Sequence, residues 1–174
     1  YELKLALQGQ PFYVCQEILE ADDIVATYAR NAAYDRVTCI SADSDFHQLT
    51  FYSRFVQISP LKKEVEVVSK REAIGTLVGK VLKGDPKDNI KKSHTQIKIK
   101  TEDLTIVKDR VYTNLVDYVK RYPEIGAQDL PLRRIVWEEL NAMFAMDRGM
   151  FDLNFTLINL IQREYSEVIS LLIS

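Results

Sequence analysis

The fold is decided by the stretch VTCISADSDFHQL at residues 37–49. It begins with a β-favouring apolar run, which is followed by two aspartates at positions 43 and 45. Residues 37–41 lack polar alternation, which predicts a strand covered on both faces, as in a parallel sheet. The apolar run at residues 11–15 predicts another strand, and residues 18–31 carry apolar side chains at helical spacing. Strand, helix and strand with short connections predict a βαβ unit.

The elements predicted next first extend this α/β unit and then become mostly helical. A short helix is predicted over residues 46–52, and a third strand over residues 55–58. Residues 64–68 alternate with period two, which predicts a half-buried antiparallel edge strand. Helical spacing then resumes from Arg71 and is closed by Gly84 as a C-terminal cap. Further apolar patterns predict helices over residues 104–122 and 132–146, and helix or part strand over 155–173.

Length and composition limit the architecture to one sizeable core. The chain has 174 residues, of which 47% are hydrophobic and 28% are charged, and this excludes disorder as the main state. We expect an α/β fold with a parallel central sheet in residues 1–80, followed by a mostly helical, lysine-rich region in residues 81–174. A net charge of −2 neither demands nor excludes a polyanionic partner.

Cysteine usage and hydropathy address the compartment. Cys15 and Cys39 lie in separate apolar runs, which predicts buried thiols of a reducing compartment, and no Cys/His zinc spacing is present. No apolar run approaches the roughly 18 residues that span a bilayer, and no basic-then-apolar leader opens the chain. We therefore expect a cytoplasmic protein that does not contact membranes.

Three acidic clusters mark the ends of predicted elements. The first two follow strands, where open α/β sheets bind their ligands. On a regular helix Glu20 and Asp23 share a face, and Asp22 joins Glu20 only if Glu20 precedes the first regular turn. The clusters are Glu20-Ala21-Asp22-Asp23, Asp43-Ser44-Asp45 and Gly84-Asp85-Pro86-Lys87-Asp88-Asn89.

Clustered carboxylates require a positive partner. Each pair repels by about 4 kcal/mol at about 4 Å and an effective dielectric near 20. Oxygen ligands favour hard divalent cations, Mg²⁺ first and Mn²⁺ second. Two such ions can activate a water and stabilise both reacting oxygens of a phosphodiester. Each cluster alone also fits turn chemistry or helix capping, but their order at three element boundaries favours a metal site.

These three motifs resemble those of the metal-dependent 5′-nucleases. That family includes flap endonucleases, the 5′-exonuclease domains of bacterial DNA polymerase I and the RNase H of T-even phages. The stretch at residues 81–89 is most similar to the phage branch, and the resemblance covers about residues 10–90. It implies a PIN-like nuclease core that binds two Mg²⁺ ions, with Mn²⁺ as a substitute.

The resemblance also implies roles for seven carboxylates and no catalytic residue beyond them. One group holds the tighter metal, with Asp23 acting directly or through water, and the other surrounds the second metal. The first group is Glu20, Asp22, Asp23 and Asp43, and the second is Asp45, Asp85 and Asp88.

The implied activity is removal of short oligonucleotides from 5′ ends of duplex DNA or RNA:DNA hybrids and cleavage of 5′ flaps. RNA-primer removal during DNA replication is the implied process, with replication proteins as partners and a bacterial host's cytoplasm as the location for a phage-encoded enzyme. The oligomeric state is not fixed by the sequence, and a monomer is the default expectation.

Two departures from the family pattern qualify these expectations. Members of the family begin with a strand carrying an aspartate, followed by a second aspartate and a basic helical arch, and no such residues precede residue 11. We therefore expect an N-terminally incomplete nuclease core, whose activity alone is an open question. After Ile90, residues 91–95 (KKSHT) replace a Gly-Ile-Gly type turn that binds a monovalent ion in many relatives.

A lysine-rich stretch follows the predicted core. Residues 80–100 contain seven lysines and two acids, a net charge of +5, which predicts contacts to duplex phosphates without base readout. A solvated lysine face is the alternative interpretation. The predicted nucleic-acid-binding residues are Lys80, Lys83, Lys87, Lys91 and Lys92.

Two other functions compete with the nuclease. Asp43-Ser44-Asp45 followed by Gly84-Asp85 also resembles haloacid-dehalogenase phosphatases, in which the first aspartate is the nucleophile. That alternative leaves the Glu20–Asp23 cluster unexplained, and Phe46 stands where Thr or Val is usual in that family. The non-enzyme alternative is a catalytically inert DNA-binding fragment.

Overall fold

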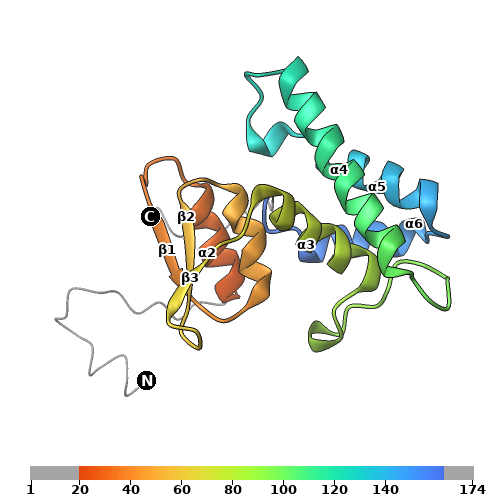
Figure 1. Ribbon diagram of the computed structural model, residues 1–174, viewed down its shortest axis with the longest axis horizontal. Coiled ribbons are helices and arrows are strands. Elements are labelled where there is room, and N and C mark those ends of the chain that lie inside the picture. The colour runs from red at the N-terminus through yellow and green to blue at the C-terminus, as the bar shows by residue number, and fades with distance from the viewer. Residues whose placement is uncertain (1–19, 163–174) are drawn as a thin grey trace.

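A three-stranded sheet forms one end of the molecule (Figure 1). The computed structural model describes residues 20–162, and the predicted strand at residues 11–15 lies outside them. The strands are β1 (Val37–Ile40), β2 (Phe55–Ser59) and β3 (Glu64–Glu66), in the order β1-β2-β3. β1 pairs with β2 in parallel and β2 pairs with β3 antiparallel. The predicted α/β class, the parallel pairing and the antiparallel edge strand are confirmed.

Helices make up most of the remaining described chain. In order they are α2 (Ala21–Arg30), η1 (Ser44–Phe51), α3 (Lys70–Lys83), η2 (Pro86–Asp88), α4 (Thr101–Arg121), η3 (Ala127–Asp129), α5 (Leu132–Met143) and α6 (Arg148–Ile158), where η marks a 3₁₀ helix. The single helix predicted over residues 132–146 ends early, and α6 starts soon afterwards. Among residues 20–162, none of the helices combines the length and apolar character needed to cross a bilayer.

Helix α3 has strong signals at both ends. Ser69 accepts a hydrogen bond from the amide of Glu72 and donates its own amide to the Glu72 side chain, a capping box. At the other end Gly84 has φ +74°, a conformation that residues with a Cβ rarely adopt. The predicted C-terminal cap at Gly84 is confirmed, and it sets the exit direction of the acidic turn that follows.

Two clusters of buried side chains form the core. The larger one joins α3, α4, α5 and α6, and the smaller one joins α2, η1 and β2 to Leu160. Gln48 on η1 donates to the Ile158 carbonyl at 3.1 Å and accepts from the Leu160 amide at 3.1 Å. The chain after α6 therefore returns to the α/β part. The predicted domain boundary at residue 80 falls within α3, which packs on both η1 and α4. The division into two domains stays a prediction.

Within the described residues, parts of the sheet are more exposed than the strand patterns predict. Thr38 and Ile40 on β1 are exposed, Ile40 by 71%, so one face of this strand is uncovered. Val65 on β3 and Val67 just after it are 48% and 91% exposed, whereas Glu66 and Val68 are partly buried, so these two valines lie on the exposed face. Among the strands that the structure describes, β3 pairs only with β2. Apolar patterning identified these strands but did not reveal which faces the helices cover.

Candidate active site

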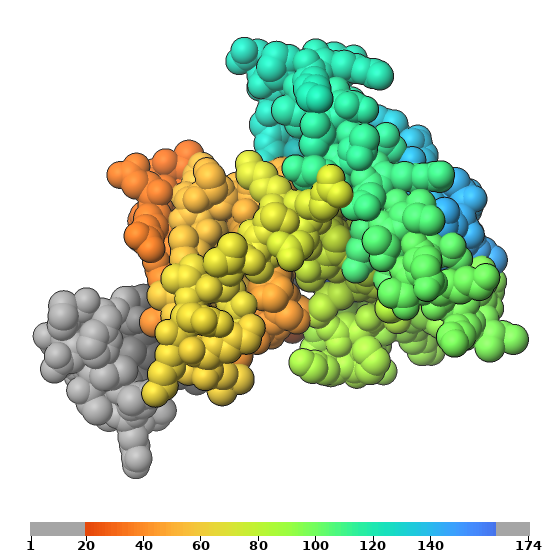
Figure 2. Space-filling model, viewed as in Figure 1, coloured from red at the N-terminus to blue at the C-terminus, as the bar shows by residue number. Residues whose placement is uncertain are grey.

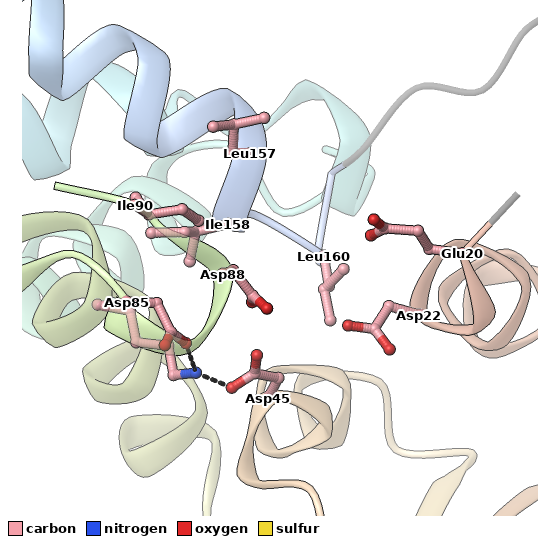
Figure 3. Close-up of a pocket in the computed structure, with 10 residues that line it drawn as sticks. Glu20, Asp22, Asp45, Asp85, Asp88, Ile90, Leu157, Ile158 and Leu160 are labelled. Carbon is pink, nitrogen blue, oxygen red and sulfur yellow. Dashed lines mark hydrogen bonds and ion pairs between the residues drawn. The ribbon is translucent and has the colours of Figure 1, made fainter.

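Carboxylates from three separated segments of the chain line one cavity of about 250 Å³ (Figure 3). They come from the start of α2, from η1, and from the end of the α3–η2 connection together with η2 itself. Opposite them stand Ile90, Leu157, Ile158 and Leu160, an apolar wall that sequence patterns did not single out. An adjoining cavity adds Asp43 and Lys87 to the same acidic group. Six of the seven predicted carboxylates are thus brought together: Glu20, Asp22, Asp43, Asp45, Asp85 and Asp88.

The start of α2 decides which of its acids face the cavity. Glu20 is the N-cap residue with extended backbone angles, φ −68° and ψ 148°, so it precedes the first regular turn. Glu20 and Asp22 consequently both line the cavity. This meets the condition, stated from the sequence, that Glu20 must precede the first turn for the two residues to face the same way. Asp23 is buried and lies among the residues that line neither cavity. Its predicted role at the metal, directly or through water, stays a prediction.

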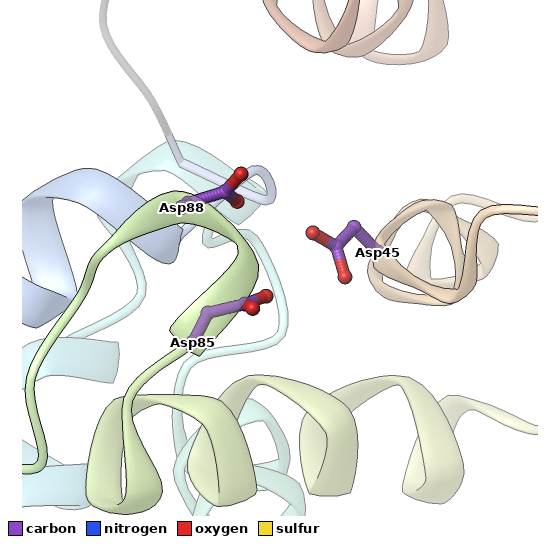
Figure 4. A group of neighbouring side chains, drawn as sticks. All are labelled: Asp45, Asp85 and Asp88. Carbon is purple, nitrogen blue, oxygen red and sulfur yellow. The ribbon is translucent and has the colours of Figure 1, made fainter.

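The loop after β1 presents the second pair of acids. The Asp43 amide donates to Ser41 Oγ at 3.1 Å, and Asp43 Oδ1 accepts from the Asp45 amide at 2.9 Å, capping η1. These local bonds turn the chain sharply at the carboxyl end of β1. Asp45 therefore points across the cavity toward the turn after α3 (Figure 4).

The third cluster is held by a compact turn. Asp85 and Ile90 exchange backbone hydrogen bonds at 2.9 and 2.8 Å, and Asp85 Oδ1 accepts from the Lys87 amide at 3.0 Å. Asn89 closes the turn in the left-handed region with φ 56°. Asp85 and Asp88 then face Asp45, and one ligand oxygen from each of these three lies within 4.8 Å of the others.

Lys80 lines the cavity and bridges two of these carboxylates. Its ammonium group pairs with Asp45 Oδ1 and with Asp85 Oδ2, the latter at 2.8 Å. Its side chain is 23% exposed, against 17% for Asp45 and 10% for Asp85. Sequence analysis assigned Lys80 only to nucleic acid, and that assignment stays a prediction. Its position five residues before Asp85, on the last turn of α3, was the available signal for the ion pair.

The electrostatics reflect this balance of charges. Burial raises the pKa of Asp22, and the nearby carboxylates of Asp43, Glu20, Asp23 and Asp88 raise it further. The hydrogen bond from Lys80 holds the pKa of Asp85 below its usual value. The end of the cavity at Asp22 thus carries uncompensated negative charge, while Lys80 offsets part of the negative charge at the other end.

The residues present fit hard divalent cations. The donors are carboxylate oxygens, which Mg²⁺ and Mn²⁺ prefer over nitrogen and sulfur ligands. Ligand oxygens around one Mg²⁺ lie about 2.1 Å from the ion and hence at most about 4.2 Å apart, a spacing that small side-chain movements provide at Asp45, Asp85 and Asp88. A cation already stands beside these groups in the form of the Lys80 ammonium.

We predict opposite effects of Lys80→Met on stability and on metal response. Without metal, loss of the ammonium leaves two largely buried carboxylates unpaired and costs about 1–2 kcal/mol of unfolding free energy. This corresponds to a fall in melting temperature of roughly 2–8 °C. Added Mn²⁺ should then raise the melting temperature of this variant by more than it raises that of the parent.

The matched control is Lys83→Met, three residues further along α3, because Lys83 is exposed and forms no ion pair with any residue between 20 and 162. This control should leave both melting temperatures nearly unchanged. An equal response to Mn²⁺ in Lys80→Met and in the parent would contradict a cation site at these carboxylates.

Four exposed lysines lie at the end of α3 and in the segment that follows it. Lys83, Lys87, Lys91 and Lys92 are exposed, and none of them pairs with a carboxylate in the part of the chain that the structure describes. Buried Ser93 donates to the Val81 carbonyl at 2.8 Å, which fixes the loop carrying the last two lysines against α3. In the space-filling view this loop stands beside the α/β part with a notch between them (Figure 2).

Comparison with known proteins gives likenesses in sequence and in fold. No family model matches the chain. It is 34% identical over 82 residues to the ribonuclease H of Enterobacteria phage T4, a match covering 45% of this chain and 27% of that protein.

The fold is similar to that of the T5 D15 protein co-crystallised with metal ions, with a TM-score of 0.56, 20% identity and coverage of 90% of this chain and 55% of that one. It is also similar to a mutant of the T5 5′-exonuclease, with a TM-score of 0.51, 20% identity and coverage of 82% of this chain and 56% of that one.

The chain thus spans about a quarter of the length of the curated relative and just over half of each solved structure. The sequence match to a ribonuclease H and the fold shared with a 5′-exonuclease agree with the order of the three acidic motifs. These likenesses support the resemblance to the 5′-nucleases that those motifs carry.

Proposed function

We propose that the protein is a Mg²⁺-dependent 5′-nuclease that hydrolyses phosphodiesters of DNA or RNA:DNA hybrids by a two-metal mechanism. The observation that carries this proposal is the meeting of six carboxylates, contributed by separate segments, around one cavity beside exposed lysines. The phage relatives, one of them crystallised with metal ions, support the same conclusion.

In this proposal two groups of residues hold the ions. Glu20, Asp22 and Asp43 hold one, and Asp45, Asp85 and Asp88 surround the other, with Asp23 outside the cavity. When bound, the ions supply a water activated for attack and positive charge for both reacting oxygens of the phosphodiester. The chain's own contribution is to fix these carboxylates and to let Lys80 exchange its partners when cations enter.

The substrate proposal rests on the lysines beyond the cavity. Lys83, Lys87, Lys91 and Lys92 present positive charge without carboxylate partners among the described residues, as backbone phosphates require. We propose a duplex with a 5′ end or flap as the substrate and removal of RNA primers during replication as the process. The phage T4 relative supports a site of action in the cytoplasm of a bacterial host.

Changing Lys91 and Lys92 together to Ala should weaken binding to duplex DNA and reduce its dependence on salt. Each lost phosphate contact lowers the slope of log K against log salt by about 0.9, so the double variant should lose up to about 2. Fluorescence anisotropy with a labelled duplex between about 50 and 200 mM salt, without divalent metal, measures this slope.

The control is the double change of Lys62 and Lys63 to Ala, an adjacent lysine pair in the turn between β2 and β3. This control should keep the parent slope because neither lysine belongs to the lysine-rich loop or lines the acidic cavities. If the two double variants have the same slope as the parent, the lysine-rich loop is a solvated face and does not bind the duplex.

A further inference from the structure

Gln57 is a polar residue in the middle of a buried strand. It lies on β2 between Val56 and Ile58, is 1% exposed, and sits opposite Cys39 in the parallel register with β1. An amide is costly to bury unless it is hydrogen-bonded, since its desolvation costs about 1–3 kcal/mol in proteins. A buried strand position between Val56 and Ile58 would suit a β-branched apolar residue, so a polar amide at this position points to a specific hydrogen-bonding role.

The amide nitrogen of Gln57 reaches the loop that carries Asp43. Nε2 donates to the Ser41 carbonyl at 2.9 Å and to the Asp43 carbonyl at 2.8 Å. Oε1 is buried and has no hydrogen-bond partner among the described residues. Within that part of the chain, both bonds of this side chain therefore go to the loop, and the whole polar role of the residue is to hold it.

The loop needs this attachment because it brings the Asp43 carboxylate close to another carboxylate. Asp43 lies close enough to Asp22 for the two carboxylates to repel, which drives the end of β1 away from α2. The bonds inside the loop, from Ser41 Oγ and Asp43 Oδ1 to following amides, set its shape but attach it to nothing else. The Ser41 amide donates to the Ile58 carbonyl at 3.1 Å and ties the start of the loop to β2, and the two bonds from Gln57 extend this attachment to Asp43.

We infer that Gln57 is a positioning residue that holds Asp43 and Asp45 in the geometry for binding divalent cations. This inference rests on the proposed function, because it assigns Gln57 a role at the same site. Groups that orient metal ligands from behind change metal affinity by about 10–100-fold when they are replaced. Gln57 occupies that place here, since it bonds to the backbone of a ligand-bearing loop and does not line either cavity.

Mn²⁺ titration of the 174-residue chain without nucleic acid, followed by the electron paramagnetic resonance signal of free Mn²⁺, tests this role. Gln57→Met keeps the length and the packing of the side chain but cannot donate to the two carbonyls. It should bind Mn²⁺ at least roughly 10-fold more weakly than the parent. Gln57→Asn keeps an amide that is one methylene too short to reach both carbonyls, and should show a smaller loss.

Gln48→Met is the matched control, because Gln48 is also 1% exposed and also forms two buried hydrogen bonds, but to Ile158 at the end of α6 and to Leu160 after it. All three variants should melt at lower temperature than the parent, whereas only the Gln57 variants should lose Mn²⁺ affinity. Parent-like affinity in both Gln57 variants, or an equal loss in Gln48→Met, would overturn the inference. A parent chain that binds no Mn²⁺ would instead overturn the proposed function, and this inference with it.

Discussion

Asp43→Ala is expected to lower the rate of metal-dependent cleavage at least roughly 1,000-fold while leaving duplex affinity within about twofold of the parent. Asp43 lies in the acidic group at the carboxyl end of β1, where it forms three hydrogen bonds. Its carboxylate has no phosphate-binding role, since it carries the same charge as the substrate. The loss therefore falls on stabilisation of the transition state and not on ground-state contacts.

Single-turnover cleavage of a 5′-flap duplex in Mg²⁺ measures the rate, and anisotropy without divalent metal measures the affinity. The assay uses the longest form of the protein that its gene encodes. The matched control is Asp35→Ala, which removes an exposed aspartate from the connection between α2 and β1 and should leave both quantities unchanged. Cleavage retained by Asp43→Ala would contradict the two-metal proposal, and absence of cleavage in the parent would favour the inert-fragment alternative.

The largest loss of stability is expected for Gly84→Ala. A Cβ at this position would stand 2.3 Å from the Ile90 carbonyl oxygen and 2.6 Å from the Lys91 carbonyl carbon, closer than real Cβ atoms come to backbone. The backbone also has φ +74°, which costs a residue with a Cβ roughly 1–2 kcal/mol by itself. We expect a loss of about 3 kcal/mol or more in unfolding free energy, since backbone atoms must move to relieve the overlap.

The same change should weaken metal binding, because the displaced turn carries Asp85 and Asp88. Thermal unfolding and Mn²⁺ titration of one preparation measure both effects. Gly149→Ala is the control: its Cβ would meet Asp147 Oδ1 at 3.5 Å, an ordinary contact, and alanine favours the helix α6. If Gly84→Ala unfolds at the parent temperature, the turn has an alternative conformation and its geometry at Asp85 is not fixed by the glycine.

Local signals in the sequence predicted much of this fold and site. Gly84 identified the end of α3, and the acidic motifs at strand and helix ends identified six residues that share one cavity. The requirement that Glu20 precede the first turn of α2 is met by its N-cap geometry. These features depend on a few neighbouring residues, so their physics is contained in short stretches of chain.

Features that depend on distant packing could not be predicted in this way. The ion pairs of Lys80 require α3 to lie beside η1, which no local pattern states. Gln48 and Gln57 are polar residues inside apolar segments, and only the path of the partner chain explains them. Val65 and Val67 are exposed for a related reason. Alternation of apolar and polar residues predicts a strand, but it does not indicate which face of that strand another element covers.

Anomalous diffraction from crystals grown with Mn²⁺ tests most directly whether these acidic side chains form a divalent-cation centre. The account predicts one Mn²⁺ within bonding distance of Asp45, Asp85 or Asp88, with the Lys80 ammonium displaced, and a second among Glu20, Asp22 and Asp43. Anomalous density elsewhere on the protein, with this cavity empty and Lys80 still bonded to Asp45 and Asp85, would contradict it.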